Sequence, residues 1–385
     1  MAPRAPNEQH KERSGPPRDR SGDNEQEMSR PIRASINIEA MRHNLERLRR
    51  AADGRTLWAV VKANAYGHGL ENAVTGFAEA DGLALIEVSE ARRARDAGWK
   101  KRILMLEGFF EAEEVAQLEA IGVEPVVHSR RQIEMLKAGS HKNLKVHVKI
   151  NSGMNRLGFA PEEAPAVIAE INAIEGVRVL DVVTHFANAE LPFEAQGPAS
   201  VSAQLSRMKP LLADNEACMA NSAAALLHPQ VGGAGIRAGI VLYGVSPDAS
   251  VSSESLGLEP VMSLTAEIIA VRVVQPGQAV GYGSRWVAER PTRIAVVACG
   301  YADGYPRSMP DGSPTHVCGK IAPIAGAVSM DMLTIDVTDV PEAVEGSLVE
   351  LWGPNVSVND LAGRCGTIGY ELVCSLARRV PVVAV

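Results

Sequence analysis

Hydrophobic and polar residues follow one pattern from about residue 34 to residue 241. Short apolar runs typical of buried strands alternate with segments whose apolar residues recur every three or four positions, as on one face of a helix. The predicted strands are 57–61, 82–88, 103–106, 123–127, 145–150, 179–184, 219–220 and 236–241. The predicted helices include 39–50, 89–97, 111–120, 130–138, 161–173 and 198–213. Eight strands alternating with helices predict an α/β fold, a (β/α)8 barrel of the TIM type.

The pattern changes after residue 258, where strands are separated by turn residues. These strands are 261–274, 278–281, 292–298, 315–317, 321–327, 332–337 and 347–351, and helical spacing returns only at 358–361 and 369–377. The pattern predicts a mostly β C-terminal domain over 261–385, after a barrel domain over 30–260. Residues 30–36, with alternating apolar positions, belong to the barrel or join the β domain.

Residues 1–29 differ from both regions. They are rich in Pro, Ser, Arg, Glu and Asn and contain almost no large apolar side chain, so we expect a disordered leader. The stretch from Met28 to Pro31 looks like a natural start of the folded part. A tag, a targeting extension and a mis-assigned start codon all remain open for the leader.

Composition narrows the class of protein. The net charge of -7 is modest, and the absence of a long basic block argues against a nucleic-acid partner. Five cysteines without a C-x-x-C pair indicate reduced thiols and a cytoplasmic protein. No apolar run approaches the roughly 18 residues that a membrane span needs, so we expect a soluble protein with no membrane partner.

Polar residues follow the predicted barrel strands at their C-terminal ends, where barrel active sites are built. They are Lys62 and Tyr66 after the first strand, Lys149, Asn155 and Arg156 at the fifth, His185 at the sixth, Asn221 and Ser222 at the seventh and Arg237 at the eighth. Each has a structural alternative: His185 could be a satisfied core histidine, Arg237 a structural ion pair, and Lys149 half of a buried salt bridge. Their convergence on one end of one barrel favours a catalytic site.

The residue types at this end indicate a cofactor. The loops after the seventh and eighth strands are the usual phosphate site of such barrels, and Asn221, Ser222 and the segment 237–240 fall there. A lysine opposite a phosphate site, without a Walker A sequence, suggests pyridoxal 5'-phosphate held as a Schiff base on Lys62. Neither H-E-x-x-H nor C-x-x-C occurs, so no catalytic metal is expected.

Nine segments then resemble the alanine racemases, a family of pyridoxal-phosphate enzymes of fold type III. They are AVVKANAYGHG at 59–69, KINSGMNRLG at 149–158, THFA at 184–187, NSA at 221–223, RAGIVLYG at 237–244, VGYG at 280–283, GYADGYP at 300–306, SMD at 329–331 and GTIGYE at 366–371. The resemblance covers residues 30–385 in unbroken order and leans toward the catabolic proteobacterial branch. It implies a homodimer in which the β domain of one chain completes the barrel site of the other.

The resemblance also implies a role for each matching residue. Lys62 would carry the cofactor and act as the base for D-alanine, while Tyr282, entering from the second subunit, would be the base for L-alanine. The cofactor-binding set would be Lys62, Tyr66, His185, Asn221, Ser222, Arg237, Gly239, Ile240 and Tyr370. Arg156 and the backbone of Met330 would receive the substrate carboxylate. Lys149 matches a lysine that some members carry as a carbamate.

Three further residues have expected positions. Asn64 and His68 are expected to shape the turn beneath Lys62. Tyr301 either lines the substrate entrance from the partner subunit or supports its Gly-rich turn.

The chemistry of racemisation supports two bases independently of the family. A proton must leave one face of Cα and another must arrive on the opposite face, which two opposed groups do better than one rigid side chain. The expected activity is interconversion of L- and D-alanine, supplying D-alanine for peptidoglycan, allowing its catabolism, or both. Competing hypotheses are a barrel-fold decarboxylase, a racemase acting on serine or lysine, a non-catalytic pyridoxal-binding barrel, and a barrel whose polar strand ends are structural.

Overall fold

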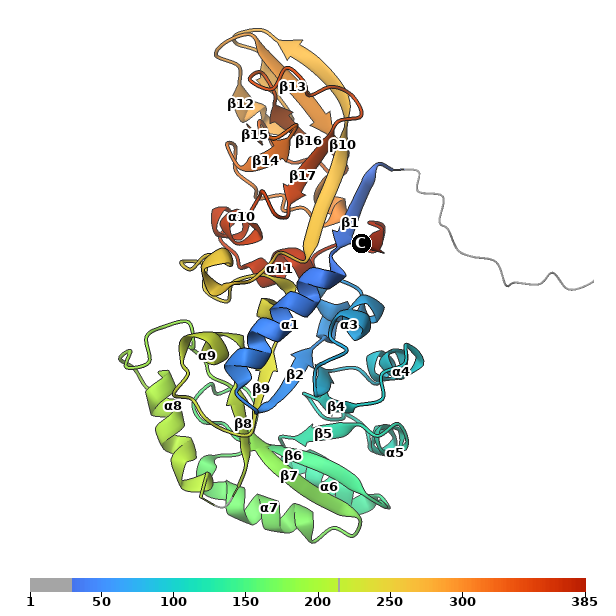
Figure 1. The fold of residues 1–385 in the computed structure, drawn as a ribbon, viewed down its shortest axis with the longest axis vertical. Helices are drawn as coiled ribbons and strands as arrows, with labels where there is room; N and C mark the ends of the chain where they lie inside the picture. Colours follow the sequence, from blue (N-terminus) through green and yellow to red (C-terminus); the bar gives the residue numbers. More distant parts are fainter. Residues whose placement is uncertain (1–29, 214) are drawn as a thin grey trace, which may run out of the picture. The chain divides into compact units, whose positions relative to one another are not determined.

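The computed structural model describes residues 30–213 and 215–385, and the predicted leader, 1–29, lies outside them. Eight parallel strands form a closed barrel in chain order, and the last closes on the first where Gly235 lies opposite Thr56 (Figure 1). They are β2 (Thr56–Val60), β3 (Gly82–Leu85), β4 (Arg102–Met105), β5 (Glu124–Val127), β6 (Leu144–Lys149), β7 (Val177–Val183), β8 (Ala217–Ala220) and β9 (Gly235–Ala238). The predicted (β/α)8 barrel is therefore confirmed.

Most of the helices connect these strands, and several begin at residues whose side chains cap them. Asn37 and Ser129 accept backbone hydrogen bonds at the starts of α1 and α6, as N-cap residues do. The helices are α1 (Ile38–Ala52), α2 (Lys62–Tyr66), α3 (Leu70–Gly76), α4 (Val88–Asp96), α5 (Ala112–Ala120), α6 (Arg130–Ala138), α7 (Ala164–Asn172), α8 (Val201–Met208), α9 (Ser222–Leu227), α10 (Val358–Arg364) and α11 (Gly369–Cys374).

Two of the predicted barrel strands end three residues early in the structure. The predicted strand 82–88 ends at Leu85, because Val88 already begins α4. The predicted strand 236–241 ends at Ala238, and the next residues turn into the 3-10 helix η3 (Ile240–Tyr243).

The C-terminal region forms a second sheet, as the prediction of a mostly β domain required. Its main strand order is β15-β14-β17-β10-β1-β18, and β13 pairs with both β10 and β16. Its strands are β1 (Ile32–Ile36), β10 (Met262–Val274), β13 (Thr292–Val297), β14 (Pro314–Val317), β15 (Lys320–Pro323), β16 (Leu333–Asp336), β17 (Leu348–Trp352) and β18 (Val382–Ala384), with a separate pair β11 (Ala279–Val280) and β12 (Trp286–Val287). The strand β1 pairs with β10 here, although it precedes the barrel in sequence (Figure 1).

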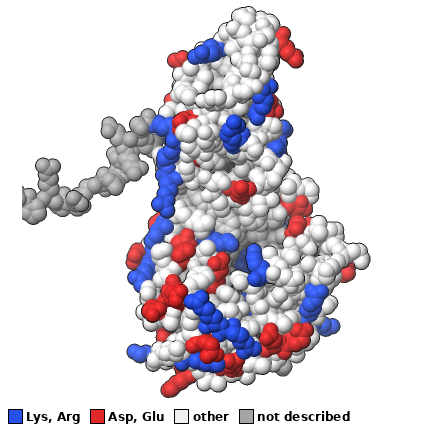
Figure 2. All heavy atoms as spheres, turned by 180° about the vertical axis from the view of Figure 1, so that it is seen from behind, with Lys and Arg blue, Asp and Glu red and all other residues white. Residues whose placement is uncertain are grey.

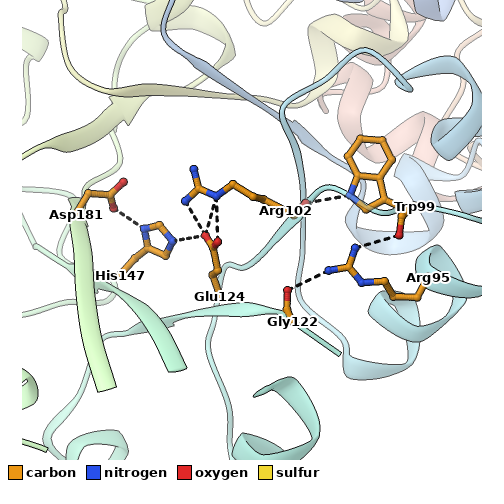
Figure 3. Close-up of polar contacts among 7 residues, drawn as sticks. All are labelled: Arg95, Trp99, Arg102, Gly122, Glu124, His147 and Asp181. Atoms are coloured by element: carbon orange, nitrogen blue, oxygen red, sulfur yellow. Dashed lines mark hydrogen bonds and ion pairs between the residues drawn. The ribbon is translucent and has the colours of Figure 1, made fainter. Parts of the chain in front are cut away.

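A row of charged side chains crosses the barrel interior below its C-terminal end. Arg102 donates to Glu124 at 2.7 Å, Glu124 lies 3.1 Å from Nε2 of His147, and Nδ1 of His147 lies 2.5 Å from Asp181 (Figure 3). The His147 ring also meets Trp58 at 6.2 Å between centroids. Because β2 and β6 are not neighbours in the sheet, this contact must cross the interior.

The surface carries charges of both signs. On the face shown in Figure 2, basic and acidic side chains are interspersed over the lower part of the view, which the barrel makes up. Within 30–213 and 215–385, none of the helices combines the length and the apolar content that a membrane span requires.

Candidate active site

A cavity of about 440 Å³ lies at the C-terminal ends of the barrel strands. Most of the residues singled out from the sequence line it, namely Lys62, Tyr66, Lys149, Arg156, His185, Asn221, Ser222, Arg237, Gly239 and Tyr370. Ile240 follows Gly239 and is fully buried, but it is not among the lining residues. The structure therefore brings residues from five barrel strands or their following loops, and from α11, to one cavity.

Besides Ile240, three singled-out residues of the C-terminal region do not line this cavity. Tyr282, Met330 and Tyr301 belong to the C-terminal region, and their side chains are 72%, 53% and 39% exposed. The aromatic ring of Tyr282 in particular has little of its surface covered by this chain. These three side chains are therefore exposed on the surface of this chain.

The chain leaves β2 through an unusual turn at Lys62. The next four residues, Ala63, Asn64, Ala65 and Tyr66, all have left-handed backbone angles, with φ between 52° and 57°. The segment α2, which consists of Lys62 and these four residues, is therefore a left-handed turn and not a right-handed α-helix. Such angles cost an L-residue about 1–2 kcal/mol each, so a run of four non-glycine residues needs support from its surroundings. The turn places both the Lys62 side chain and the Tyr66 ring in the cavity wall.

At one end of the cavity, hydroxyl groups lie close to the backbone of Gly239, which has no side chain. A Cβ added to Gly239 would lie 2.6 Å from Oη of Tyr66, so glycine is needed for this close approach. The Gly239 amide donates to Oγ of Ser222 at 2.8 Å. Burial raises the pKa of Tyr66 well above its usual value, and burial raises that of Tyr370 to about 12. Both phenols are therefore neutral hydrogen-bond donors.

Arg237 is a buried cation held by backbone carbonyl groups. Its Nη1 donates to the carbonyl of Cys218 at 2.5 Å, and its Nη2 donates to the carbonyl of Thr184. Nη2 also lies 3.5 Å from Nδ1 of His185. Burial, followed by the neighbouring positive charge of Arg237, lowers the pKa of His185 well below its usual value. The imidazole is therefore neutral and accepts from the guanidinium.

The cavity has an excess of positive charge. Lys62, Lys149, Arg156 and Arg237 all line it. Burial and the charges of Arg237 and Arg156 lower the pKa of Lys149 to about 7. An anionic group bound in the cavity would therefore be attracted by several cations at once.

Two cavity residues, and a third that packs against the cavity wall, were missed by the analysis of the sequence. Glu107 lines the cavity and directly follows the residues predicted as the third strand, so the strand-end rule could have found it. Cys374 lies four residues after Tyr370 on the same helix, a spacing that puts both on one face. Tyr243 packs its ring 4.9 Å from that of Tyr66 and has no comparable signal in the sequence.

These features fit pyridoxal 5'-phosphate. The hydroxyls of Tyr66, Ser222 and Tyr370, gathered beside a glycine whose Cβ would collide with the first of them, suit a phosphate group. The Lys62 amine lies in the same cavity, where it can attach an aldehyde. For a metal, by contrast, the described residues hold no cluster of three His, Cys, Asp or Glu side chains able to bind one.

Comparisons with known protein families agree with this geometry. The model described as "Alanine racemase, N-terminal domain" matches residues 36–247, and the model described as "Alanine racemase, C-terminal domain" matches residues 261–384. The two matches together cover most of the chain.

Individual relatives match along nearly their whole length. The alanine racemase of Janthinobacterium sp. (strain Marseille) is 49% identical over 361 residues, which are 93% of this chain and 100% of that protein. A catabolic alanine racemase of Klebsiella aerogenes is 46% identical, covering 92% of this chain and 99% of that protein. The crystal structure of the biosynthetic alanine racemase from Pseudomonas aeruginosa superposes with a TM-score of 0.87 at 45% identity, over 92% of this chain and 99% of that one.

Proposed function

The chain belongs to the alanine racemase family of isomerases, and we propose that it interconverts L- and D-alanine with pyridoxal 5'-phosphate and two bases, Lys62 and Tyr282. The observation that carries the proposal is the single cavity that holds the Lys62 amine, three hydroxyl groups and the buried Arg237 guanidinium. A lysine for attachment, donors for a phosphate and a cation for a ring nitrogen are the three contacts that this cofactor needs.

The cofactor-binding residues would contact different parts of the cofactor. The hydroxyls of Tyr66, Ser222 and Tyr370, with the amides of Gly239 and Ile240, would hold the phosphate. Arg237 would face the ring nitrogen, with His185 behind it, and Asn221 would complete the pocket near Ser222. When bound, the cofactor supplies the electron withdrawal that makes the Cα proton of an amino acid removable. Because a guanidinium does not give up its proton near neutral pH, Arg237 would limit this withdrawal and with it the side reactions.

The proton transfers fall to two side chains on opposite faces of Cα. Lys62 would remove or return the proton of D-alanine, and Tyr282 that of L-alanine. Arg156 and the backbone of Met330 would orient the substrate carboxylate. Orientation matters because both bases must reach the same carbon at near hydrogen-bonding distance.

The second base supports a shared site in a homodimer. Tyr282 is 72% exposed and does not line the cavity of its own chain. We infer that Tyr282, Met330 and Tyr301 of one protomer complete the cavity of the other. Residues 37–260 would supply the barrel, and residues 261–385 together with β1 would supply the completing β domain. Tyr301 would then lie at the substrate entrance.

The cysteines bear on the compartment of the protein, and its relatives bear on the physiological role. All five cysteines are free thiols, which suits the reducing cytoplasm. A catabolic and a biosynthetic relative are 46% and 45% identical to this chain, so overall identity favours neither role. We propose that the enzyme supplies D-alanine for peptidoglycan, allows D-alanine to be degraded, or does both.

The proposal is tested by a chiral assay of the purified holoenzyme with a panel of L- and D-amino acids. We expect L- and D-alanine to reach the same equal mixture from either side, with serine and lysine racemised more slowly. Release of CO2 would identify a decarboxylase instead, and faster turnover of serine or lysine would overturn the substrate assignment. Borohydride reduction followed by peptide mass spectrometry should place the cofactor on Lys62, and attachment elsewhere would reject that role.

A further inference from the structure

The left-handed run after Lys62 is supported by bonds within the same loop. The amide of Ala65 donates to the carbonyl of Val61 at 2.8 Å, and the amide of Gly67 donates to that of Ala63 at 3.1 Å. These bonds close the turn but do not fix it to the rest of the barrel. Residues that are forced into sparsely populated backbone angles persist only where surrounding groups determine them.

A side chain from the next barrel unit provides that anchor. Oε1 of Glu90, in the first turn of α4, accepts a hydrogen bond of 2.8 Å from the amide of Asn64, in the middle of the left-handed run. Glu90 is only 7% exposed, whereas Glu87, three residues earlier, is exposed. The contact joins the loop after β2 to the helix after β3, so it fixes the turn against a different part of the barrel.

The side chain of Asn64 extends the same connection. Its Oδ1 accepts from the amide of Leu70 at 3.2 Å and from Nη2 of Arg93 at 3.1 Å. Arg93, one turn after Glu90 on α4, also pairs with Glu71 at 2.9 Å. Helix α4 therefore contacts Asn64 twice. Glu90 accepts from the backbone amide of Asn64, and Arg93 donates to its side chain.

His68 supports the far end of the turn. It is fully buried, and its Nδ1 lies 2.9 Å from the carbonyl of Tyr66 and 3.1 Å from that of Ala65. Because both partners are acceptors, Nδ1 carries the proton. Burial lowers the pKa of His68 to about 4, which keeps the ring neutral.

We propose that Glu90 is a positioning residue for the proposed cofactor site, because it holds the left-handed turn that aims the Lys62 amine and the Tyr66 hydroxyl into one cavity. The inference rests on the proposed roles of Lys62 and Tyr66. It assigns to Glu90 no contact with substrate or cofactor, since Glu90 does not line the cavity. Its action is through the backbone of Asn64.

The variants are chosen to keep or to remove the hydrogen-bond acceptor that Glu90 presents to the Asn64 amide. An amide oxygen accepts as a carboxylate oxygen does, so Glu90→Gln keeps the bond to the Asn64 amide. Glu90→Leu keeps the size but removes the acceptor, and Glu90→Asp keeps the charge but is one methylene too short to reach. Glu87→Leu makes the same change at the exposed neighbouring glutamate and is the matched control.

Two measurements on the full chain separate positioning from a general loss of stability. Hydrogen–deuterium exchange of the cofactor-free protein reports on residues 62–69 directly, and titration with pyridoxal 5'-phosphate gives the dissociation constant. For Glu90→Leu and Glu90→Asp we expect faster exchange confined to this segment and affinity weaker by roughly tenfold, as the loss of one hydrogen bond predicts. In alanine turnover, kcat should fall more than KM changes. Glu90→Gln and Glu87→Leu should stay within about twofold of wild type on every measure.

A rescue variant tests the conformational cause. Ala63 is exposed and has φ of 54°, so Ala63→Gly lowers the cost of the left-handed turn without removing a contact. Added to Glu90→Leu or Glu90→Asp, it should restore part of the cofactor affinity. Wild-type exchange and affinity in Glu90→Asp, which retains the buried charge and so should fold, would overturn the inference. Failure of borohydride to fix the cofactor to Lys62 in the wild type would instead reject the proposed function.

Discussion

Nδ1 of His147 lies 2.5 Å from Oδ1 of Asp181 inside the barrel, and the two residues are register partners on β6 and β7. The other ring nitrogen faces Oε2 of Glu124 at 3.1 Å. An imidazole with a carboxylate at each nitrogen must donate from both, so His147 is an imidazolium. Burial alone would lower its pKa, but the hydrogen bonds to Asp181 and Glu124 outweigh burial and raise it.

This row of charges predicts a pH-dependent stability. The pKa of His147 is raised on folding. Its contribution to the free energy of unfolding is therefore fully present below the unfolded-state pKa of about 6.5, and it is lost as the pH rises through the folded-state pKa. Glu124 behaves oppositely: burial would raise its pKa, but bonds from His147 and Arg102 hold it at about 2. Its contribution is present above its unfolded value of about 4.5 and is lost as the pH falls toward 2.

The measurement is the unfolding free energy of wild type and His147→Gln between pH 5 and pH 9. We expect the variant to be less stable by roughly 3–5 kcal/mol near pH 6, as for other broken buried ion pairs, with the difference shrinking toward pH 9. A difference between wild type and His147→Gln that is constant over this range would contradict the imidazolium assignment.

The close approach of Gly239 to Tyr66 predicts that a larger residue at position 239 weakens cofactor binding. In Gly239→Ala the new Cβ would lie 2.6 Å from Oη of Tyr66, and the hydroxyl must move away. Losing one hydrogen bond to a charged phosphate costs about 1.5–3 kcal/mol, so cofactor affinity should fall roughly 10–100-fold. Gly232→Ala is a control, because nothing lies within 4 Å of its Cβ position. Unchanged affinity in a cofactor titration of Gly239→Ala would show that Tyr66 does not bind the phosphate.

The lowered pKa of Lys149 predicts a dependence on carbon dioxide. With a pKa of about 7, much of this amine is neutral near physiological pH. A neutral amine can attack the carbon of CO2, forming an N–C bond and releasing a proton, and we propose that Lys149 becomes a carbamate in this way. The added negative charge would face Arg156, which contributes to the low pKa of the amine.

The test is alanine turnover in CO2-free buffer, with and without added bicarbonate. We expect kcat to fall by roughly tenfold without CO2, the scale of one charge-assisted hydrogen bond, and to recover with bicarbonate. Recovery should be greater at pH 8 than at pH 6, because the neutral amine increases with pH. Lys149→Gln should not respond to bicarbonate, and a wild type that is equally insensitive would reject the carbamate.

The barrel could be predicted from the sequence because its signal is local. Each strand and helix shows its own period, and strand order then places Lys62, His185 and Arg237 at one end without knowledge of any distance. The row through Glu124 and His147 escaped prediction, because it depends on the register of four strands. Both residues lie within predicted strands. The hydrophobic period that identifies a strand does not indicate which of its polar side chains are buried.

A turn after Lys62 was predicted, but its left-handed conformation escaped prediction, for a different reason. Alanine and asparagine in the run Ala63–Asn64–Ala65 indicate a turn or a right-handed helix, since left-handed angles are unfavourable for L-residues. What stabilises the observed angles is Glu90, 26 positions away in sequence. Local preferences along the chain do not indicate such a distant contact, which appears only in the packed barrel.

The proposed shared site can be tested with two variants, each of which lacks one of the two bases. Lys62→Ala lacks the amine in both sites of a homodimer, and Tyr282→Phe lacks the phenol in both. Each variant alone should be slower than wild type by roughly 10²–10⁴-fold, the usual contribution of a general base. Neither variant should unfold, because the Tyr282 side chain is 72% exposed and the Lys62 side chain points into a cavity.

Mixing the two variants after dissociation and reassociation distinguishes a shared site from a site within one chain. In a hybrid dimer one site would combine Lys62 of the Tyr282→Phe chain with Tyr282 of the Lys62→Ala chain, and it would be fully wild type. The other site would lack both bases. Random reassociation makes half of the dimers hybrids, so recovery should approach about one quarter of wild-type activity. If both bases came from one chain, no hybrid would contain an intact site and activity would remain at the level of the variants.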